Sequence, residues 1–488
     1  MDKPEESLVA NFYEGKTVFL TGATGFLGKV LVEKILRSCP GVDSVYCLVR
    51  PKRGQDPKTR FEIYIKNLVF DRVRQEQPQN LSKVHLICGD VTEDGLGISQ
   101  EDRKLLSEKV DVVFHSAATV KFVEPIEVAL QMNTFGTRKV VELCREMKNL
   151  KAFVHVSTCY SNAVIKDIAE KVYSPPMDPD LLKKLLKEMP TEETKNAKSL
   201  IGNHPNTYTF TKAMAEHIVL NETGNIPTAI VRPSIITGSL NEPFPGWVDN
   251  LAGITGLTTE TMRGTYRSAV CNVACRVDLI PVDLVANCII VAAAEVHKNK
   301  PANGPQVYNC STGEQNPLKW GRLRDHIIQG AIETPTKYMQ FYPSCTYRKS
   351  KAVHLFMVFF LHYLPALALD LYLKLAGKRQ MAMKIFTNTR NAEKMGEYFA
   401  TREWNFKSAN LMQLVETQSD ADRKRFSIDC RQIHWESYVK SYIKGIVMFV
   451  LKDDSFTQSV TKNKLQKLYW VQFFCRGVVL VLTLALLL

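Results

Sequence analysis

The N-terminal part of the chain alternates short apolar, β-branched runs with longer amphipathic stretches. Apolar runs of this length, separated by helical periodicity, are typical of parallel strands joined by helices. Helical spacing covers Val128–Glu146 and Thr211–Asn221. The pattern predicts an α/β fold, a doubly wound parallel sheet with helices on both faces. The predicted strands are Thr17–Thr21, Ser44–Val49, Val84–Cys88, Val110–His115, Ala152–Ser157 and Thr228–Arg232.

Beyond Pro317 the pattern becomes helical and basic, which places a boundary near residues 335–350. Val353–Ala376 is long enough to cross a bilayer, but two histidines, a proline and an aspartate interrupt it. Leu468–Leu488 meets the roughly 20-residue requirement without a proline. We expect this tail to be a C-terminal membrane anchor, with a buried terminal helix as the alternative. The predicted domains are 1–340, a catalytic Rossmann domain; 341–465, a smaller helical domain; and 466–488, the anchor.

Charge supports a membrane partner. The chain carries 63 Lys and Arg against 50 Asp and Glu, and residues 341–488 alone hold 22 against 11. Nucleic acid, an anionic membrane or an acidic substrate would each suit this excess, and the neighbouring apolar segments favour the membrane over nucleic acid. None of the 12 cysteines forms a C-x-x-C pair, and no metal site is predicted. The polar N-terminus is unlike a secretory signal, so we expect reduced thiols and a cytosol-facing catalytic domain.

A glycine-rich turn is the most informative motif. The strand ending at Thr21 runs into Gly22, Gly25 and Gly28, and the helical spacing begins directly after it. Glycines at such a strand–turn–helix junction admit a close pyrophosphate, which the N–H groups of the helix start can bind. We expect a dinucleotide here rather than an ordinary turn. The cofactor-binding residues predicted in this turn are Thr21, Gly22, Thr24, Gly25, Phe26, Leu27 and Gly28.

Basic residues after the second strand indicate which dinucleotide is bound. Arg50 stands where NAD-preferring sites carry an acidic residue, and Lys52 and Arg60 follow. Cations at this position suit the 2′-phosphate of NADP, although a solvated basic loop is the alternative. Asp90 and Val91 would border the adenine. Ser116 and Ala117, after the fourth strand, would pass under the cofactor.

A tyrosine–lysine pair supplies the candidate catalytic groups. Tyr208 and Lys212 are four residues apart, so on a helix they share one face. An ammonium beside a phenol stabilises the phenolate and brings its pKa toward the working range. The strand ending in Ser157–Thr158 precedes them and would present a hydroxyl to a substrate carbonyl, with Thr158 preferred. The order of these motifs is typical of short-chain dehydrogenases/reductases.

Further stretches extend this resemblance over nearly the whole chain. They are TGATGFLGKVLVEKIL, HSAATVKF, HVSTCYSN, YTFTKAMAE, VRPSII, PFPGWVDN and LIPVDLVAN. Together they resemble the alcohol-forming fatty acyl-CoA reductases. The resemblance implies an extended Rossmann fold, NADPH, a long-chain acyl-CoA substrate and a fatty alcohol product. It also implies catalytic roles for Thr158, Tyr208 and Lys212. Ser268–Val277 departs from the pattern. The cofactor-binding residues are completed by Tyr208, Lys212, Asn133 and Pro233.

Two other functions stay open at this point. One is a membrane-bound sterol or sugar-nucleotide dehydrogenase, which would not release CoA. The other is a non-enzymatic NADPH-binding scaffold, which the intact catalytic residues disfavour. The long segment between Thr158 and Tyr208 contains a helical stretch with Leu181, Leu182 and Leu185 on one face. It is a surface helix, a lid over the acyl chain, or a basic face for the CoA phosphates formed by Lys183, Lys184 and Lys187. We expect the endoplasmic reticulum rather than the peroxisome, and a homodimer stays open.

Overall fold

The computed structural model describes residues 6–51, 55–188, 200–301 and 304–487. The chain forms two compact units that interleave along the sequence. The first comprises Met1–Ile236, Asp278–Asn316 and Trp404–Gln432, and the second Thr237–Val277, Pro317–Glu403 and Ile433–Leu488. The three domains expected from the sequence, 1–340, 341–465 and 466–488, stay a prediction, because the two compact units do not say what each segment does.

The first unit is built on a seven-stranded sheet in the order β12-β7-β5-β4-β1-β2-β3. All neighbouring strands are parallel. The strand order reverses between β1 and β4, so the sheet is doubly wound as predicted. The strands are β1 Thr17–Thr21, β2 Ser44–Val49, β3 Val84–Cys88, β4 Val112–His115, β5 Ala152–Val156, β7 Thr228–Pro233 and β12 Gln306–Cys310.

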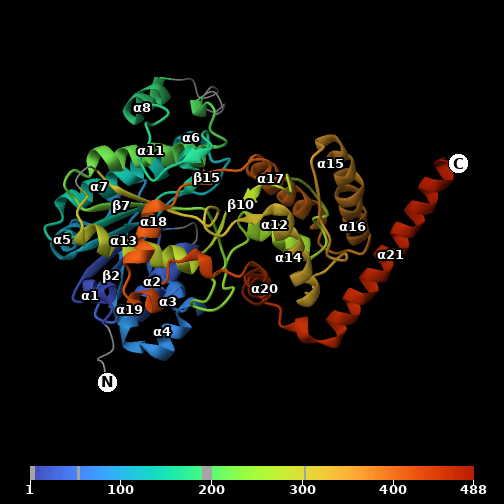
Figure 1. Cartoon of the computed structure of the whole chain (residues 1–488), viewed down its shortest axis with the longest axis horizontal. Coiled ribbons are helices and arrows are strands. Elements are labelled where there is room, and N and C mark those ends of the chain that lie inside the picture. The colour runs from blue at the N-terminus through green and yellow to red at the C-terminus, as the bar shows by residue number, and fades with distance from the viewer. Residues whose placement is uncertain (1–5, 52–54, 189–199, 302–303, 488) are drawn as a thin grey trace. The chain divides into compact units, whose positions relative to one another are not determined.

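Helices cover both faces of this sheet (Figure 1). Helices α2 and α13 pack together on one face, and α7 and α11 pack together on the other. Apolar side chains of α5, α7 and α11 and of the strands form a core cluster on the second of these faces. The helices of this unit are α1 Leu8–Phe12, α2 Phe26–Ser38, α3 Pro57–Ile65, α4 Asp71–Glu76, α5 Gln100–Lys109, α6 Ile126–Leu130, α7 Gly136–Glu146, α8 Pro179–Glu188, α11 Thr207–Glu222, α13 Val282–Lys298, α18 Ala409–Thr417 and α19 Asp420–Arg425.

The second unit is mainly helical, as its sequence pattern predicts. Its helices are α12 Ile254–Met262, α14 Trp320–Glu333, α15 Lys351–Val358, α16 Leu364–Leu375, α17 Ala382–Ala400, α20 Trp435–Gly445 and α21 Ser459–Leu487. The remaining short strands of the chain are β6 Asp167–Ile168, β8 Ile235–Thr237, β9 Ser268–Val270, β10 Arg276–Val277, β11 Leu279–Pro281, β13 Leu318–Lys319, β14 Thr346–Arg348 and β15 Asn405–Phe406.

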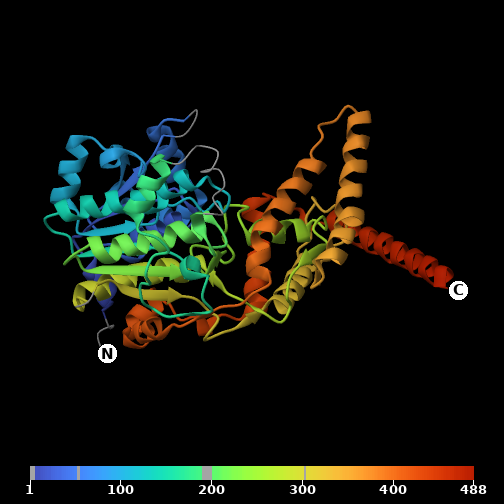
Figure 2. The same ribbon diagram turned by 90° about the horizontal axis from the view of Figure 1, so that it is seen from above.

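One helix in the described part of the chain is long and apolar enough to cross a membrane. It is Lys351–Leu375, which joins α15 to α16 through a π-helical turn, and little of it is buried. The two histidines, the proline and the aspartate that were expected to interrupt this segment do not end the helix. The Asp370 carboxylate instead accepts hydrogen bonds from the N–H groups of Met381, Ala382 and Met383 at the start of α17. Figure 2 shows the loop that connects α16 to α17.

The predicted anchor Leu468–Leu488 lies only partly within the described residues. Helix α21 covers Ser459–Leu487. Trp470, Phe473 and Phe474 are about half exposed or more on it, with fractions of 48%, 55% and 66%. The side chains of residues 476 and 478–488 are outside the described set, so the anchor stays a prediction.

Candidate active site

The glycine turn after β1 forms a cradle with no room for side chains. Gly22 has φ +82°, and a Cβ on it would lie 2.7 Å from the backbone nitrogen of Ala117. A Cβ on Gly28 would lie 2.8 Å from the Cα of Ala23. Gly25 precedes the first residue of α2, and no side chain among the described residues caps that helix. The positive end of the α2 dipole therefore lies at this turn, which fits a dinucleotide pyrophosphate.

The ends of β1 and β4 are hydrogen-bonded to each other where the strand order reverses. Ser116 N donates to the carbonyl of Thr21 at 3.2 Å, and Ala117 N donates to Thr21 Oγ1 at 3.2 Å. In open α/β sheets, ligands bind outside the carboxyl ends of the strands at this reversal. The structure thus brings Thr21, Gly22, Ser116 and Ala117 together, as the sequence predicted.

Basic side chains lie beside the same turn. Arg60, on α3, donates to Thr24 Oγ1 at 3.4 Å and to the carbonyl of Arg50. The Arg50 guanidinium lies 3.6 Å from the Asp90 carboxylate and is half exposed. Burial and the charge of Arg50 lower the pKa of Arg60 below its usual value. Two predicted cations are therefore beside the cradle, and the third, Lys52, lies outside the described residues.

Helix α11 carries both candidate catalytic residues on its first two turns. Asn206 caps it by accepting from Thr209 N at 2.9 Å, so the helix begins four residues before the predicted Thr211. Lys212 is buried, and its Nζ donates to the carbonyl of Val156 at 2.7 Å. Burial lowers the pKa of Lys212 to about 8, while Glu216 acts in the opposite direction. The ammonium is thus held against the end of β5.

The two hydroxyl residues after β5 face different partners. Phe122 stacks on the ring of Tyr208 with centroids 6.0 Å apart. Burial raises the pKa of Tyr208 to about 12, and the nearby Thr158 hydroxyl opposes that rise. Ser157 instead donates to the buried Glu216 carboxylate. Thr158 therefore lies with Tyr208, whereas Ser157 is engaged inside the core.

Glu216 is a residue that sequence reasoning missed. It is 1% exposed and forms an ion pair with the fully buried Arg232, whose Nε lies 2.8 Å from Glu216 Oε1. Ser157 and Ser161 donate to the same carboxylate. Because Glu216 is one helical turn after Lys212, it holds β5, β7 and α11 together directly behind the catalytic pair. The helical spacing that puts Glu216 on the same face of α11 as Tyr208 and Lys212 was the signal in the sequence that could have identified it.

Two histidines behind the crevice were also missed. The His115 ring bonds Thr21 Oγ1 at 2.7 Å through Nδ1 and Thr137 Oγ1 at 3.0 Å through Nε2. Burial lowers the pKa of His115 to about 3, so the ring is neutral. His155 lies beside it with ring centroids 5.3 Å apart, and neither of its nitrogens has a hydrogen-bond partner in the described parts of the chain.

The remaining predicted cofactor residues differ in their surroundings. Asn133 is fully buried. Its side-chain oxygen accepts a hydrogen bond from Thr119 N, and its side-chain nitrogen donates to the carbonyl of Thr119 and to the hydroxyl of Thr211. The carbonyl of Pro233 accepts from Thr158 at 3.4 Å, which puts it beside the candidate catalytic threonine. Val91 packs in the core of the sheet. Leu27 is buried, and Phe26 is partly exposed.

Comparison with known proteins decides the family. Two family models, both described as male sterility protein, match residues 20–289 and 361–453, and the first is an NAD-binding model. Fatty acyl-CoA reductase 1 of Homo sapiens is 38% identical over 475 residues, covering 97% of this chain and 92% of the relative. The chain belongs to the fatty acyl-CoA reductase family. The resemblance stated from the motifs is thereby confirmed.

A second relative agrees with this fatty acyl-CoA reductase assignment, and two solved structures share the fold. Fatty acyl-CoA reductase 2 of Bos taurus is 35% identical, covering 95% of this chain and 90% of the relative. A reductase domain of a nonribosomal peptide synthetase from Mycobacterium tuberculosis has a TM-score of 0.59 at 19% identity, covering 92% of this chain and 94% of that chain. The terminal R domain of the myxalamid pathway scores 0.58 at 20% identity, covering 89% and 91%. These two structures show a shared fold.

Proposed function

We propose that this protein reduces long-chain fatty acyl-CoA to the primary alcohol and free CoA, through an aldehyde and with two NADPH. The observation that carries the proposal is the Thr158 hydroxyl close enough to Tyr208 to lower its pKa, with Lys212 on the same face of the helix as Tyr208, in a fatty acyl-CoA reductase. In this proposal one carbonyl oxygen accepts from both hydroxyls.

The first reduction makes a tetrahedral oxyanion from the thioester. Thr158 and Tyr208 donate hydrogen bonds to that oxygen and stabilise its charge. When the carbonyl re-forms, the carbon–sulfur bond breaks, CoA leaves as the thiolate, and the aldehyde remains. When bound, the reduced nicotinamide supplies the hydride for this step and for the second one.

The second reduction requires a proton as well as a hydride. Tyr208 is protonated across the working pH range, since burial holds its pKa at about 12, and its hydroxyl donates the proton to the alkoxide. The ammonium of Lys212 stabilises the phenolate that results. At pH 7 Lys212 is mostly charged, because its lowered pKa of about 8 still lies above that pH.

NADPH rather than NADH is proposed as the reductant. Arg60 and Arg50 lie next to the glycine turn, where a 2′-phosphate would accept charge-assisted hydrogen bonds. Asp90 lies near Arg50 and is half of an ion pair, so it does not present an uncompensated negative charge to that phosphate.

We also propose that the protein is attached to a membrane. The exposed apolar helix Lys351–Leu375 supports this, as do the basic residues of the last third of the chain. In this proposal residues 1–340 form the catalytic domain facing the cytosol, 341–465 the helical domain and 466–488 the anchor. The endoplasmic reticulum is the proposed membrane.

Thiol release tests the reaction. The purified full chain is incubated with NADPH and palmitoyl-CoA, and free thiol is measured with a chromogenic disulfide while NADPH absorbance is followed. We expect one thiol for every two NADPH oxidised. NADPH oxidation without thiol release, or oxidation with a sterol or sugar nucleotide in place of the acyl-CoA, would contradict the proposal.

A further inference from the structure

Polar side chains attach one side of the helix Lys351–Leu375 to its own unit. The ring of His354 is buried, and its Nδ1 lies 3.0 Å from the hydroxyl oxygen of Ser268 in β9. Near the middle of the helix, His362 accepts a hydrogen bond from the backbone N–H of Arg267 at 2.9 Å. The carboxylate that binds the start of α17 lies near the end of the helix. This inner side is therefore held along most of its length.

The partners of the inner side are unsuited to hydrocarbon. On α17, Glu393 forms an ion pair with Arg390, and His354 Nε2 lies 3.0 Å from Glu393 Oε1. Strand β9 pairs with β14 alone in the described part of the chain. In the core of a bilayer, charged side chains are costly and lipid-exposed strand edges do not occur. These partners therefore belong outside the bilayer core.

The length of the helix alone would allow it to cross a bilayer. Its 25 residues rise by about 37 Å, and the hydrocarbon core is about 30 Å thick. A crossing, however, would put His362 near the midplane, and the backbone before β9 is hydrogen-bonded to that ring. The ion pair on α17 would be brought into the same layer. The contacts of the inner side thus exclude the placement that the length permits.

The outer side of the same helix is apolar and exposed from one end to the other. Little of the helix is buried, and Leu375 at its end is 82% exposed. An apolar surface of this extent marks a contact with lipid or protein. Helices that lie in the plane of a membrane bury such a face at the boundary between headgroups and acyl chains. The exposed apolar residues used in this argument are Leu355, Phe356, Phe360, Leu367, Leu371 and Leu375.

The segment that follows this helix is basic. No aspartate or glutamate occurs in residues 371–392. Lys374, Lys378, Arg379 and Lys384 lie within this stretch, and all four are exposed. Cations beside an exposed apolar face are attracted to anionic lipid headgroups. The surface therefore matches an anionic membrane in both its apolar part and its charged part.

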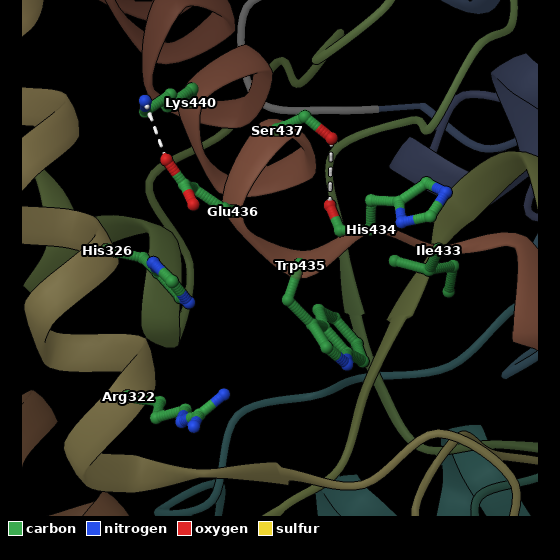
Figure 3. A pocket seen from close by; sticks show the side chains of 8 residues that line it. All are labelled: Arg322, His326, Ile433, His434, Trp435, Glu436, Ser437 and Lys440. Carbon is green, nitrogen blue, oxygen red and sulfur yellow. Dashed lines mark hydrogen bonds and ion pairs between the residues drawn. The ribbon is translucent and has the colours of Figure 1, made fainter.

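The cations around the open hollow of this unit have different surroundings. Figure 3 shows Arg322 of α14 and Lys440 of α20 lining that hollow. The Nζ atom of Lys440 lies 2.9 Å from a Glu436 carboxylate oxygen and 3.2 Å from one of Glu333. Acidic groups thus balance the charge of this surface, which makes it a matched comparison for the basic segment 371–392.

We propose that the outer face of Lys351–Leu375 enters one leaflet of an anionic membrane without crossing it. The cations of the α16–α17 loop then lie at the headgroups, and both ends of the helix stay on the same side of the bilayer. The inference rests on the membrane attachment proposed for this protein, and it specifies an interfacial helix in place of a span.

Cysteine labelling tests the placement of the two helix ends. The full chain with Lys349→Cys or Gln380→Cys, both at exposed positions, is bound to sealed vesicles of phosphatidylcholine and phosphatidylglycerol and recovered by flotation. A membrane-impermeant maleimide is added before or after detergent, and labelled peptides are identified by mass spectrometry. We expect both cysteines to react before detergent as fully as after it. Protection of either cysteine until detergent is added would overturn the proposal.

Lipid photolabelling tests the contact itself. The vesicles contain phosphatidylglycerol with a diazirine in its acyl chain, and adducts are located by peptide mass spectrometry. We expect adducts on the outer face of Lys351–Leu375. Adducts confined to the proposed anchor 466–488 would overturn the proposal. If the helix is unlabelled and Leu367→Glu lowers the mass of the protein measured by light scattering, the face is an interface between copies, which would also overturn it.

Charge variants test the choice of an anionic surface. Lys378→Gln/Arg379→Gln should lower the ratio of adducts on the helix to adducts on α21 at least about fivefold, since a cation near an anionic surface strengthens binding by about that factor. Arg322→Gln/Lys440→Gln removes the same charge from the same unit and should leave the ratio unchanged. An equal loss for both double variants would contradict the proposal.

The same preparations separate this inference from the functions on which it rests. A full chain that binds no vesicles would contradict membrane attachment and the interfacial helix together. A protected cysteine in vesicle-bound protein would contradict the interfacial helix alone. Thiol release from palmitoyl-CoA is measured in parallel, and its absence in protein with both cysteines accessible would contradict the proposed reaction alone.

Discussion

Helices α11 and α16 depart from the usual distribution of side chains in opposite directions. Helix α11 buries Lys212 and Glu216, with exposed fractions of 2% and 1%. Helix α16 has no fully buried residue and exposes Leu371 and Tyr372 instead. Charged residues are almost never fully buried without partners, and contiguous apolar patches are rarely left exposed.

The two helices differ in what stabilises their unusual side chains. Burying Lys212 and Glu216 costs free energy, which Arg232, Ser157 and the Val156 carbonyl offset through defined hydrogen bonds. Those bonds hold the catalytic pair in one geometry. The exposed side chains of α16 take part in no such network among the described residues, and the proposed membrane contact would cover them.

The largest effect is expected at the hydroxyl of Tyr208. Tyr208→Phe removes one oxygen from α11 and leaves the ring stacked on Phe122. General acid catalysis is worth roughly 10²–10⁴-fold, so turnover should fall by that factor. The Kd for NADPH, measured by fluorescence titration, should stay within a few-fold of the wild-type value. Turnover close to that of the wild type would remove Tyr208 from the mechanism.

The cofactor cations should show the next largest effect on the kinetic parameters. Arg50→Ala should weaken NADPH far more than NADH, since a charge-assisted hydrogen bond contributes about 1.5–3 kcal/mol, or about 10- to 150-fold. KM for both cofactors is measured at fixed acyl-CoA. Lys58→Ala, on the first turns of α3, is a control cation. An equal loss for both cofactors would mean that Arg50 does not contact the 2′-phosphate.

Glu216→Gln tests the network behind the catalytic pair. It should destabilise the protein by about 3–5 kcal/mol, because Arg232 loses its buried counter-charge. The pH profile separates this from a purely structural effect. Activity needs the Lys212 ammonium, so it should decline as pH rises through the pKa of about 8. Glu216 raises that pKa, and its removal should therefore move the decline to lower pH. If the variant folds and its pH profile of activity does not move, Glu216 does not set the pKa of Lys212.

The smallest effect is expected on the exposed face of α16. Leu371→Glu places a charge where lipid contact is proposed and should lower liposome binding about tenfold, since burial of a leucine contributes about 1.5–3 kcal/mol. Flotation of the full chain measures it. Leu251→Glu is the matched control, because Leu251 is 53% exposed in the same unit. Equal binding by both variants would show that α16 does not contact the bilayer.

The sheet was largely predictable because parallel strands are buried on both faces and appear as continuous apolar runs. Three of the six predicted strands have the predicted ends, and β4 begins at Val112 because Val110 N still bonds the last turn of α5. Strand β12 was missed. Its Asn309 interrupts the apolar run, and this buried amide binds the carbonyls of Ile168 and Lys407.

The return of residues 404–432 to the first unit could not be predicted from local pattern. It depends on distant contacts such as Ser7 with Asp422 and Trp404 Nε1 with the carbonyl of Ala163. In the candidate site, the glycine turn and the tyrosine–lysine spacing are local and were found. Glu216 and His115 were not, since either residue type on a helix or strand is more often exposed than part of a buried network.

Deuterium transfer tests the central claim most directly. The full chain is incubated with palmitoyl-CoA and NADPH deuterated at the transferable C4 position, and the product is identified by mass spectrometry. Two hydride transfers to one carbon predict hexadecanol with two deuterium atoms, both on C1. Hexadecanal with a single deuterium as the final product, or an alcohol with fewer than two, would contradict the account.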